Sequence, residues 1–223
     1  MDSSDEQLLG YKFGRHVLTL RHSQGGVTLI ELMVGVVIIS ILFAVGAPSF
    51  SSWLKNTSIR TAAEAIQNGL QLARAEAVRR NNIVRFQLTS TSNNSCILST
   101  ANSTWIVSTD GPLTGDPTGQ CSSNPSDITA PYIIQARSSK EGSKGIVVLA
   151  SQATVAFNGL GRQTTVKNLD TTVVNPANVI IKIPDPSTVT CSSSVRCMQV
   201  QISTTGQIRM CDPALASTDP QGC

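Results

Sequence analysis

The sequence predicts an α+β fold in which one long N-terminal helix packs on an antiparallel β-sheet domain. Three observations support this prediction. An apolar run over residues 27–50 continues into an amphipathic pattern over residues 51–80. Short β-branched segments, separated by Gly, Pro, Asn and Ser clusters, occupy residues 81–223. All six cysteines lie in that last part, as expected of an exported domain held by disulfides.

The apolar run over 27–50 contains a single ionisable side chain, that of Glu31. The run is long enough to span a bilayer, which takes about 20 residues. A secretory signal peptide has a shorter apolar region, a plain membrane anchor leaves Glu31 unexplained, and a buried core helix is rarely this apolar. We therefore expect a membrane-spanning helix, and a carboxylate inside such a span usually marks function because it is costly there.

The helical pattern continues beyond the apolar run as the amphipathic half of the same helix. From Ile59 onward the apolar residues recur at steps of three and four along one face, which comprises Ile59, Ala62, Ala63, Ile66, Leu70, Ala73 and Ala77. We expect this face to pack on the sheet and assign it no ligand role. The predicted helix covers residues 28–80, Pro48 kinks it or loosens its preceding turn, and Asn81-Asn82 ends it.

Short strands are predicted in the remainder of the chain. They cover residues 83–89, 104–109, 132–138, 145–149, 154–157, 179–183, 198–203 and 206–211, with turns at 158–159 and 204–206. Residues 110–131 form a long loop rich in Gly and Pro, which is either a contact surface for a partner or an insertion held by Cys121. Aromatic residues make up only 4% of the chain, so an aliphatic core is expected.

The cysteines favour disulfides over a metal site. Six cysteines allow 15 pairings, and proximity in the sequence suggests Cys96–Cys121, Cys191–Cys197 and Cys211–Cys223. A structural zinc site is the competing interpretation, but no Cys-x-x-Cys pair is present. We therefore expect no metal.

Enzymatic function is not expected. The only histidines, His16 and His22, lie in the first 26 residues, so the remainder lacks histidine-dependent nucleophilic chemistry and histidine metal ligands. No phosphate-binding loop is present, and Gly159-Leu160-Gly161 lacks the third glycine of a dinucleotide site. We predict no cofactor and no small-molecule substrate.

The segment Gly26-Val27-Thr28-Leu29-Ile30-Glu31 resembles the class III leader site of type IV pilins and type II secretion pseudopilins. The resemblance implies that a prepilin peptidase removes residues 1–26, cutting between Gly26 and Val27, and methylates the new N-terminus. Glu31 and Pro48 then stand at the fifth and twenty-second mature positions, where the family has them. In the family, the Glu31 carboxylate pairs with the N-terminal amine of a neighbouring subunit during assembly.

The leader charges and the cysteines together predict the location of the chain. Basic residues Lys12, Arg15 and Arg21 lie closest to the apolar run, which favours a cytoplasmic N-terminus. The expected precursor is a single-pass protein of the bacterial inner membrane with residues 81–223 in the periplasm. It then enters a pilus or pseudopilus with other minor and major subunits.

The C-terminal half is similar to the FimT, FimU and GspH group of minor pilins, at residues 157–162 and 206–213. The resemblance implies a structural subunit that primes or caps the assembly of a type IV pilus or a type II secretion pseudopilus. One alternative is DNA capture during uptake through Arg162 and Arg209, although Gln207 replaces the first arginine of the DNA-binding segment. Another is a pseudopilin that contacts secreted proteins. The net charge of +3 is modest for DNA binding.

Overall fold

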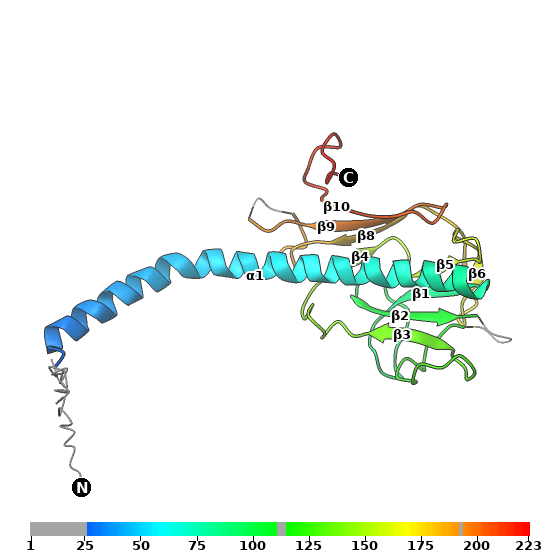
Figure 1. Cartoon of the computed structure of the whole chain (residues 1–223), viewed down its shortest axis with the longest axis horizontal. Coiled ribbons are helices and arrows are strands. Elements are labelled where there is room, and N and C mark those ends of the chain that lie inside the picture. Colours follow the sequence, from blue (N-terminus) through cyan, green and yellow to red (C-terminus); the bar gives the residue numbers. More distant parts are fainter. Residues whose placement is uncertain (1–25, 111–114, 192–193) are drawn as a thin grey trace, which may run out of the picture. The chain divides into compact units, whose positions relative to one another are not determined.

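The computed structural model describes residues 26–110, 115–191 and 194–223, without the side chains of 45–49. The chain divides into two compact units, residues 1–44 and 45–223. The described residues form one helix, α1 (Leu29–Arg80), followed by strands β1 to β10 (Figure 1). The predicted leader up to residue 25 and residues 111–114 of the predicted loop lie outside the described residues.

Local hydrogen bonds define both ends of α1. The Thr28 side chain accepts a hydrogen bond from the Glu31 backbone N–H at 3.3 Å, which is the arrangement of an N-cap. At the other end Asn81 adopts a left-handed conformation with φ of 47°, and the Asn82 N–H donates to the Ala77 carbonyl at 3.2 Å. The helix predicted over 28–80 is confirmed to within one residue.

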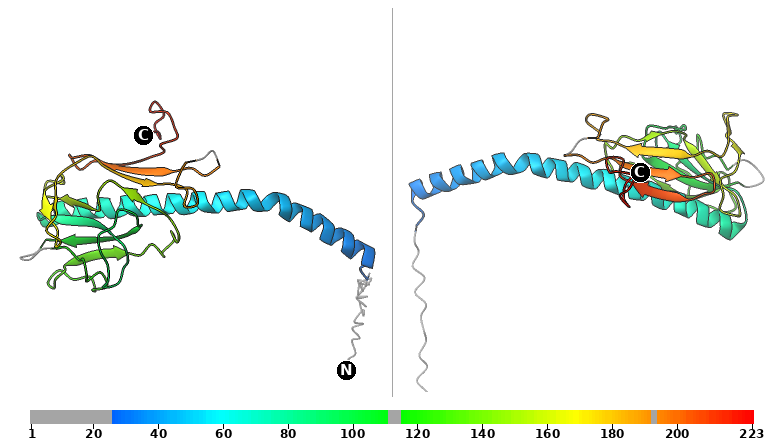
Figure 2. Two further views of the ribbon diagram at one scale, coloured as in Figure 1. Left: turned by 180° about the vertical axis from the view of Figure 1, so that it is seen from behind. Right: turned by 90° about the horizontal axis from the view of Figure 1, so that it is seen from above.

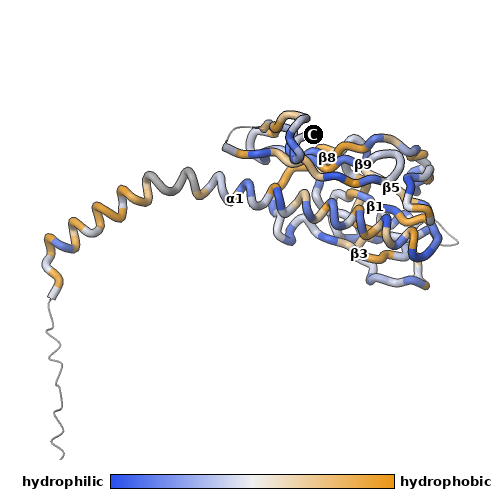
Figure 3. Tube along the Cα trace, turned by 45° about the horizontal axis from the view of Figure 1, so that its top comes forward, coloured by the Kyte–Doolittle hydropathy of each residue, from blue (hydrophilic) through white to orange (hydrophobic). Residues whose placement is uncertain are grey.

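In the described part of the first unit, residues 29–44 form the exposed, apolar start of α1. Orange, hydrophobic positions dominate this stretch in Figure 3. Within the part of the chain that the structure describes, no helical segment is both apolar enough and long enough to cross a membrane. The membrane span over 27–50 stays a prediction, as does the kink at Pro48, whose side chain is outside the described set.

The second unit contains two four-stranded antiparallel sheets, where the sequence pattern had suggested one. The first has the order β3-β2-β1-β5 and the second the order β10-β9-β8-β4, and β6 and β7 form a separate pair. The strands are β1 (Val84–Thr89), β2 (Thr104–Thr109), β3 (Ile133–Arg137), β4 (Leu149–Ala150), β5 (Thr154–Phe157), β6 (Val166–Lys167), β7 (Val173–Val174), β8 (Val179–Ile183), β9 (Met198–Ile202) and β10 (Ile208–Cys211).

Both sheets pack against the same length of α1 (Figures 1 and 2). The whole predicted apolar face of the helix, from Ile59 to Ala77, is buried in a single core cluster. That cluster also contains Phe86 of β1, Trp105 of β2 and Ile181 of β8. The two sheets are therefore joined through the helix, and the prediction that its apolar face packs on a sheet is confirmed.

The outer face of the first sheet is covered by loops and carries a buried ion pair. Arg85 in β1 is 3% exposed, and its guanidinium contacts both carboxylate oxygens of Asp110 at 2.6 and 2.9 Å. The same guanidinium donates to the Lys167 carbonyl at 3.1 Å. Because both faces of β1 are covered, every one of its residues is buried.

Three short segments differ from the predicted strands. Residues 145–148 were expected to form a strand but join no sheet, since only Leu149 and Ala150 pair with β8. Their apolar character reflects burial of Ile146 and Val148 in the core as irregular backbone. β6 and β7 were missed because two residues each are too few to produce an alternating pattern.

The three disulfides are Cys96–Cys121, Cys191–Cys197 and Cys211–Cys223, so the pairing predicted from sequence proximity is confirmed. Cys96 and Cys121 form a small buried cluster with Ile106 and Ile133, which ties the loop after β2 to the first sheet. Cys211–Cys223 fastens the last residues of the chain to the end of β10. No cluster suited to holding a metal ion occurs among the residues with described positions.

A glycine on the buried face of α1 provides a test of this packing. A Cβ atom at Gly69 would lie 2.8 Å from a Phe86 ring carbon and 3.0 Å from a Trp105 ring carbon. In an open helix, replacing Gly with Ala stabilises by about 1 kcal/mol, whereas overpacking a core costs about 1–3 kcal/mol. We expect Gly69→Ala to lower the free energy of unfolding, measured by urea unfolding of the full chain in detergent with tryptophan fluorescence.

Gly35→Ala is the matched control, because a Cβ atom at Gly35 of the same helix would meet nothing within 4 Å. This variant should leave the urea midpoint unchanged or raise it slightly. An increase in stability for Gly69→Ala would show that the helix does not approach the first sheet as closely as described.

Candidate functional site

The N-terminal end of α1 combines an exposed apolar surface with one carboxylate. Gly26 and Val27 precede the helix, and Glu31 lies in its first turn. Its side chain is exposed and forms no ion pair with any residue in the described parts of the chain. The large apolar side chains nearby are more than half exposed and include Val27, Leu29, Ile30, Leu32, Met33, Val34, Val36, Val37, Ile38, Ile39, Ile41, Leu42 and Phe43.

Such a surface is much larger than the apolar patches that monomeric proteins leave in water, and it marks a contact with other apolar groups. The Glu31 backbone N–H is already used by the Thr28 cap, so its carboxylate is not needed to start the helix. The arrangement supplies a helix for apolar packing and, beside Gly26 and Val27, one carboxylate that has no ion-pair partner among the residues whose positions are described. The roles of these residues in cleavage and assembly stay predictions.

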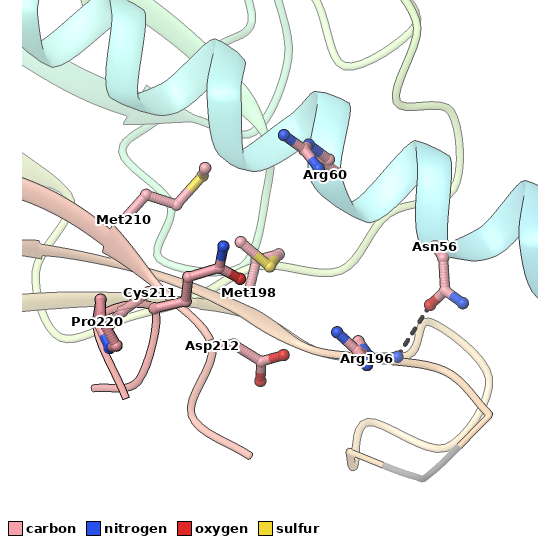
Figure 4. Close-up of a pocket in the computed structure, with 9 residues that line it drawn as sticks. Asn56, Arg60, Arg196, Met198, Met210, Cys211, Asp212 and Pro220 are labelled. Atoms are coloured by element: carbon pink, nitrogen blue, oxygen red, sulfur yellow. Dashed lines mark hydrogen bonds between the residues drawn. The ribbon is translucent and has the colours of Figure 1, made fainter. Parts of the chain in front are cut away.

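A second candidate is a groove between α1 and the edge of the second sheet (Figure 4). Its volume is about 390 Å³. Met198 of β9 and Met210 of β10 point toward the helix, which contributes Asn56 and Arg60. The remaining lining residues are Arg196, Cys211, Asp212, Pro220 and Gln221.

Asn56 fixes one end of this groove by bonding the segment that precedes β9. Its side-chain oxygen accepts from the Arg196 backbone N–H at 2.9 Å, and its amide nitrogen donates to the Ser194 carbonyl at 3.1 Å. The sequence analysis missed this groove, because one wall comes from α1 and the others come from residues 196–221, and these two parts are far apart in the chain. The one local feature that could have indicated the groove is Asn56, a polar residue near the start of the amphipathic half of α1. The sequence alone does not show that Asn56 bonds residues 194 and 196.

The two segments nominated for DNA binding lie next to each other. A Cβ atom at Gly206, whose φ is 85°, would lie 2.0 Å from the Gly161 carbonyl oxygen, so this turn contacts the Gly161-Arg162 backbone at a position that suits only glycine. Arg162 is exposed. The Arg209 guanidinium donates to the Gly222 and Pro220 carbonyls at 2.6 and 3.3 Å, so it holds the C-terminal tail. Contact of either arginine with DNA stays a prediction.

One ion pair attaches the long loop over 110–131 to the end of α1, next to two ion pairs within the helix. Glu76 bonds the guanidinium groups of Arg79 and Arg80, and Arg80 also contacts Asp127 of the loop at 2.6 Å. The hydrogen bond from Arg79, followed by that from Arg80, lowers the pKa of the Glu76 carboxyl below its ordinary value against the opposing effect of burial. These cations also complement the negative end of the helix dipole.

A further ion pair connects α1 to the turn after β8, close to the groove. Lys55 lies 3.6 Å from the Asp185 carboxylate and donates to the Ser187 hydroxyl at 2.8 Å. The backbone N–H of Ser187 is the main cause that lowers the pKa of Asp185, and the charge of Lys55 acts in the same direction. Both ends of the amphipathic half of α1 are thus tied to loops of the second unit.

Comparison with solved structures finds two crystal forms of the type IV minor pilin FimU from Pseudomonas aeruginosa strain PAO1. Each is 15% identical in sequence and covers 74% of this chain. The matches cover 94% and 98% of the FimU chains, with TM-scores of 0.42 and 0.40. No curated protein matches the chain.

Two family models match the sequence. The prokaryotic N-terminal methylation motif matches residues 21–47, which include Gly26, Val27 and Glu31. The model of type II transport protein GspH matches residues 62–206, from the buried face of α1 to the hairpin turn before β10, which is more than half of the chain. The chain therefore belongs to the GspH family of pilin-like proteins and carries the N-terminal methylation motif at the start of its helix.

Proposed function

We propose that this chain is a minor pilin or pseudopilin, a structural subunit that primes or caps the assembly of a type IV pilus or a type II secretion pseudopilus. The observation that carries the proposal is the part of α1 in the first unit, where a long series of exposed apolar side chains contains a single ionisable group, the Glu31 carboxylate. In a fibre, this surface is covered by the same helices of neighbouring subunits, so its exposure in one chain is removed by assembly.

The proposed route begins in the bacterial inner membrane, with the N-terminus in the cytoplasm and the β-domain in the periplasm. Prepilin peptidase cuts between Gly26 and Val27, and the new amine is methylated. The position of the methylation motif at residues 21–47 supports this site. The second unit supplies lateral contacts, a structural rather than a catalytic task.

Glu31 acts in this proposal as the docking charge. Apolar helices can slide past one another with little change in energy, whereas one buried ion pair fixes a single register. The amine of a neighbouring Val27 is the proposed partner of the carboxylate. The loss of one member of a buried pair costs about 3–5 kcal/mol.

One prediction of this proposal concerns processing. Gly26→Arg replaces the residue before the proposed cut, so the leader should remain attached and the chain should stay in the membrane fraction. Mass spectrometry of the purified protein measures this directly, with Gly25→Ala as a control that should still be processed. An unchanged mature mass for Gly26→Arg would refute the proposed cleavage site.

Another prediction concerns assembly. Glu31→Ala and Glu31→Gln should be folded and cleaved, because the carboxylate contacts no described residue and the Thr28 cap uses the backbone. Incorporation into sheared fibres, measured by immunoblot, should fall by more than about a hundredfold, as expected for the loss of a buried charge pair. Glu31→Asp keeps the charge and should retain more incorporation than Glu31→Gln. Equal incorporation of all three variants would remove the docking role.

A deletion strain tests the proposed function as a whole. Loss of surface pili, restored by the intact gene, would assign the chain to a type IV pilus. Loss of secreted proteins with normal pili would assign it to the type II secretion pseudopilus. If neither changes, the proposal of an assembly subunit is wrong.

A further inference from the structure

β10 is an edge strand with free backbone groups. It pairs with β9 alone, with Ile208 opposite Ile202 and Met210 opposite Val200. In the turn that precedes β10, the Ser203 N–H donates to the Gln207 carbonyl, so Ser203 and Gln207 are a hydrogen-bonded pair. Because such pairs alternate along an antiparallel ladder, the N–H and C=O groups of Ile208 and Met210 point away from β9.

The C-terminal tail pairs with the Asp212 end of this edge and is also held by the Arg209 side chain of β10, whereas the described residues leave the outward backbone groups of Ile208 and Met210 free. The Asp212 N–H donates to the Gln221 carbonyl at 2.7 Å, and Cys223 is fastened to Cys211. Among the described residues, no backbone hydrogen bond outside the sheet reaches Ile208 or Met210. An exposed edge of this kind is a template for pairing with another extended chain.

The groove described above lies directly under this edge. Met210 and Met198 are half-buried and pack on the core, so the floor of the groove is apolar and built from flexible side chains. A strand added to β10 would direct alternate side chains toward α1, as Met210 is directed. The volume of about 390 Å³ accommodates such side chains.

The charged side chains that line the groove differ in whether they have an interaction partner. Arg60 is paired with Glu64 at 2.8 Å. Asp212 is 5% exposed, and its carboxylate accepts a hydrogen bond from the Ala214 N–H at 2.9 Å. Arg196 is exposed, and its guanidinium has no partner among the residues described. Among the described residues at the rim, the charged group that is available to a ligand is therefore the positive guanidinium of Arg196.

We propose that the free edge of β10 and the groove beneath it bind an extended segment of another protein by strand addition. The backbone of the segment pairs with Ile208 and Met210. An apolar side chain of the segment packs on Met198 and Met210, and an acidic side chain on the same face meets Arg196. The occupant is thus an extended segment that combines apolar and acidic residues.

The test uses the full chain in detergent micelles and fluorescein-labelled nonapeptides of alternating Thr and Val. In the acidic probe one Val is replaced by Asp, so Asp and Val lie two positions apart on one face. The matched probe has Lys instead of Asp. Fluorescence anisotropy should show saturable binding of the acidic probe and weaker binding of the lysine probe.

Arg196→Glu should weaken the acidic probe about fivefold to tenfold, the range expected for reversing one exposed charge pair. Lys140→Glu is the control, because it makes a comparable charge change on an exposed side chain that does not line the groove. Met210→Pro removes the outward N–H, a change that an edge strand tolerates on its free side, and it should abolish binding. Met210→Leu keeps both the N–H and the apolar floor and should retain it.

The three disulfides, verified by mass spectrometry in each variant, report whether the fold is intact. Binding of the lysine probe as tight as that of the acidic probe, or no effect of Arg196→Glu, would overturn the assignment of an acidic partner. Retained binding in Met210→Pro would overturn strand addition. Self-association of the chain that is lost in Met210→Pro, without any probe binding, would mean that the edge pairs with a second copy instead.

Discussion

The packing of one face of α1 against two sheets is the contact on which the rest of the second unit depends. That face includes the small residues Ala62, Ala63, Ala73 and Ala77 beside Gly69, and at Gly69 the rings of Phe86 and Trp105 of the first sheet approach the helix closely. A helix of larger residues would keep Phe86 and Trp105 at a greater distance. The two sheets share no strand, and their common core around the helix is what makes them one unit.

The same helix has two halves with different physical requirements. The apolar side chains between Ile59 and Ala77 are buried against the two sheets of the same chain, whereas those between Val27 and Phe43 are exposed. A protein that leaves so much apolar surface uncovered needs an apolar environment supplied by other molecules. In the proposed assembly, the folded state of one chain and the assembly of many chains therefore use consecutive segments of one helix.

The features that sequence analysis could predict are local ones. The extent of α1 followed from the apolar run, its amphipathic continuation and the Asn81-Asn82 end, and the cysteine pairs followed from proximity in the chain. The features that it missed depend on contacts between distant segments: the division into two sheets, the Arg85–Asp110 pair and the groove at Asn56. Ile146 and Val148 show the same limit, because burial as irregular backbone and burial in a strand produce the same apolar pattern.

In the two proposals, the exposed half of α1 and the edge of β10 recognise partners by different physics. Apolar packing along a helix is strong but weakly specific in register, so a single charge such as Glu31 has a large effect on position. Pairing at a sheet edge is directional, because each N–H must meet a carbonyl, and its specificity comes from the side chains that enter the groove. The proposed functions assign the common contact, shared by all subunits, to the helix. They assign the contact that distinguishes one partner from another to β10. There, Arg196 and the two methionines contact the side chains of the added strand and so select its sequence.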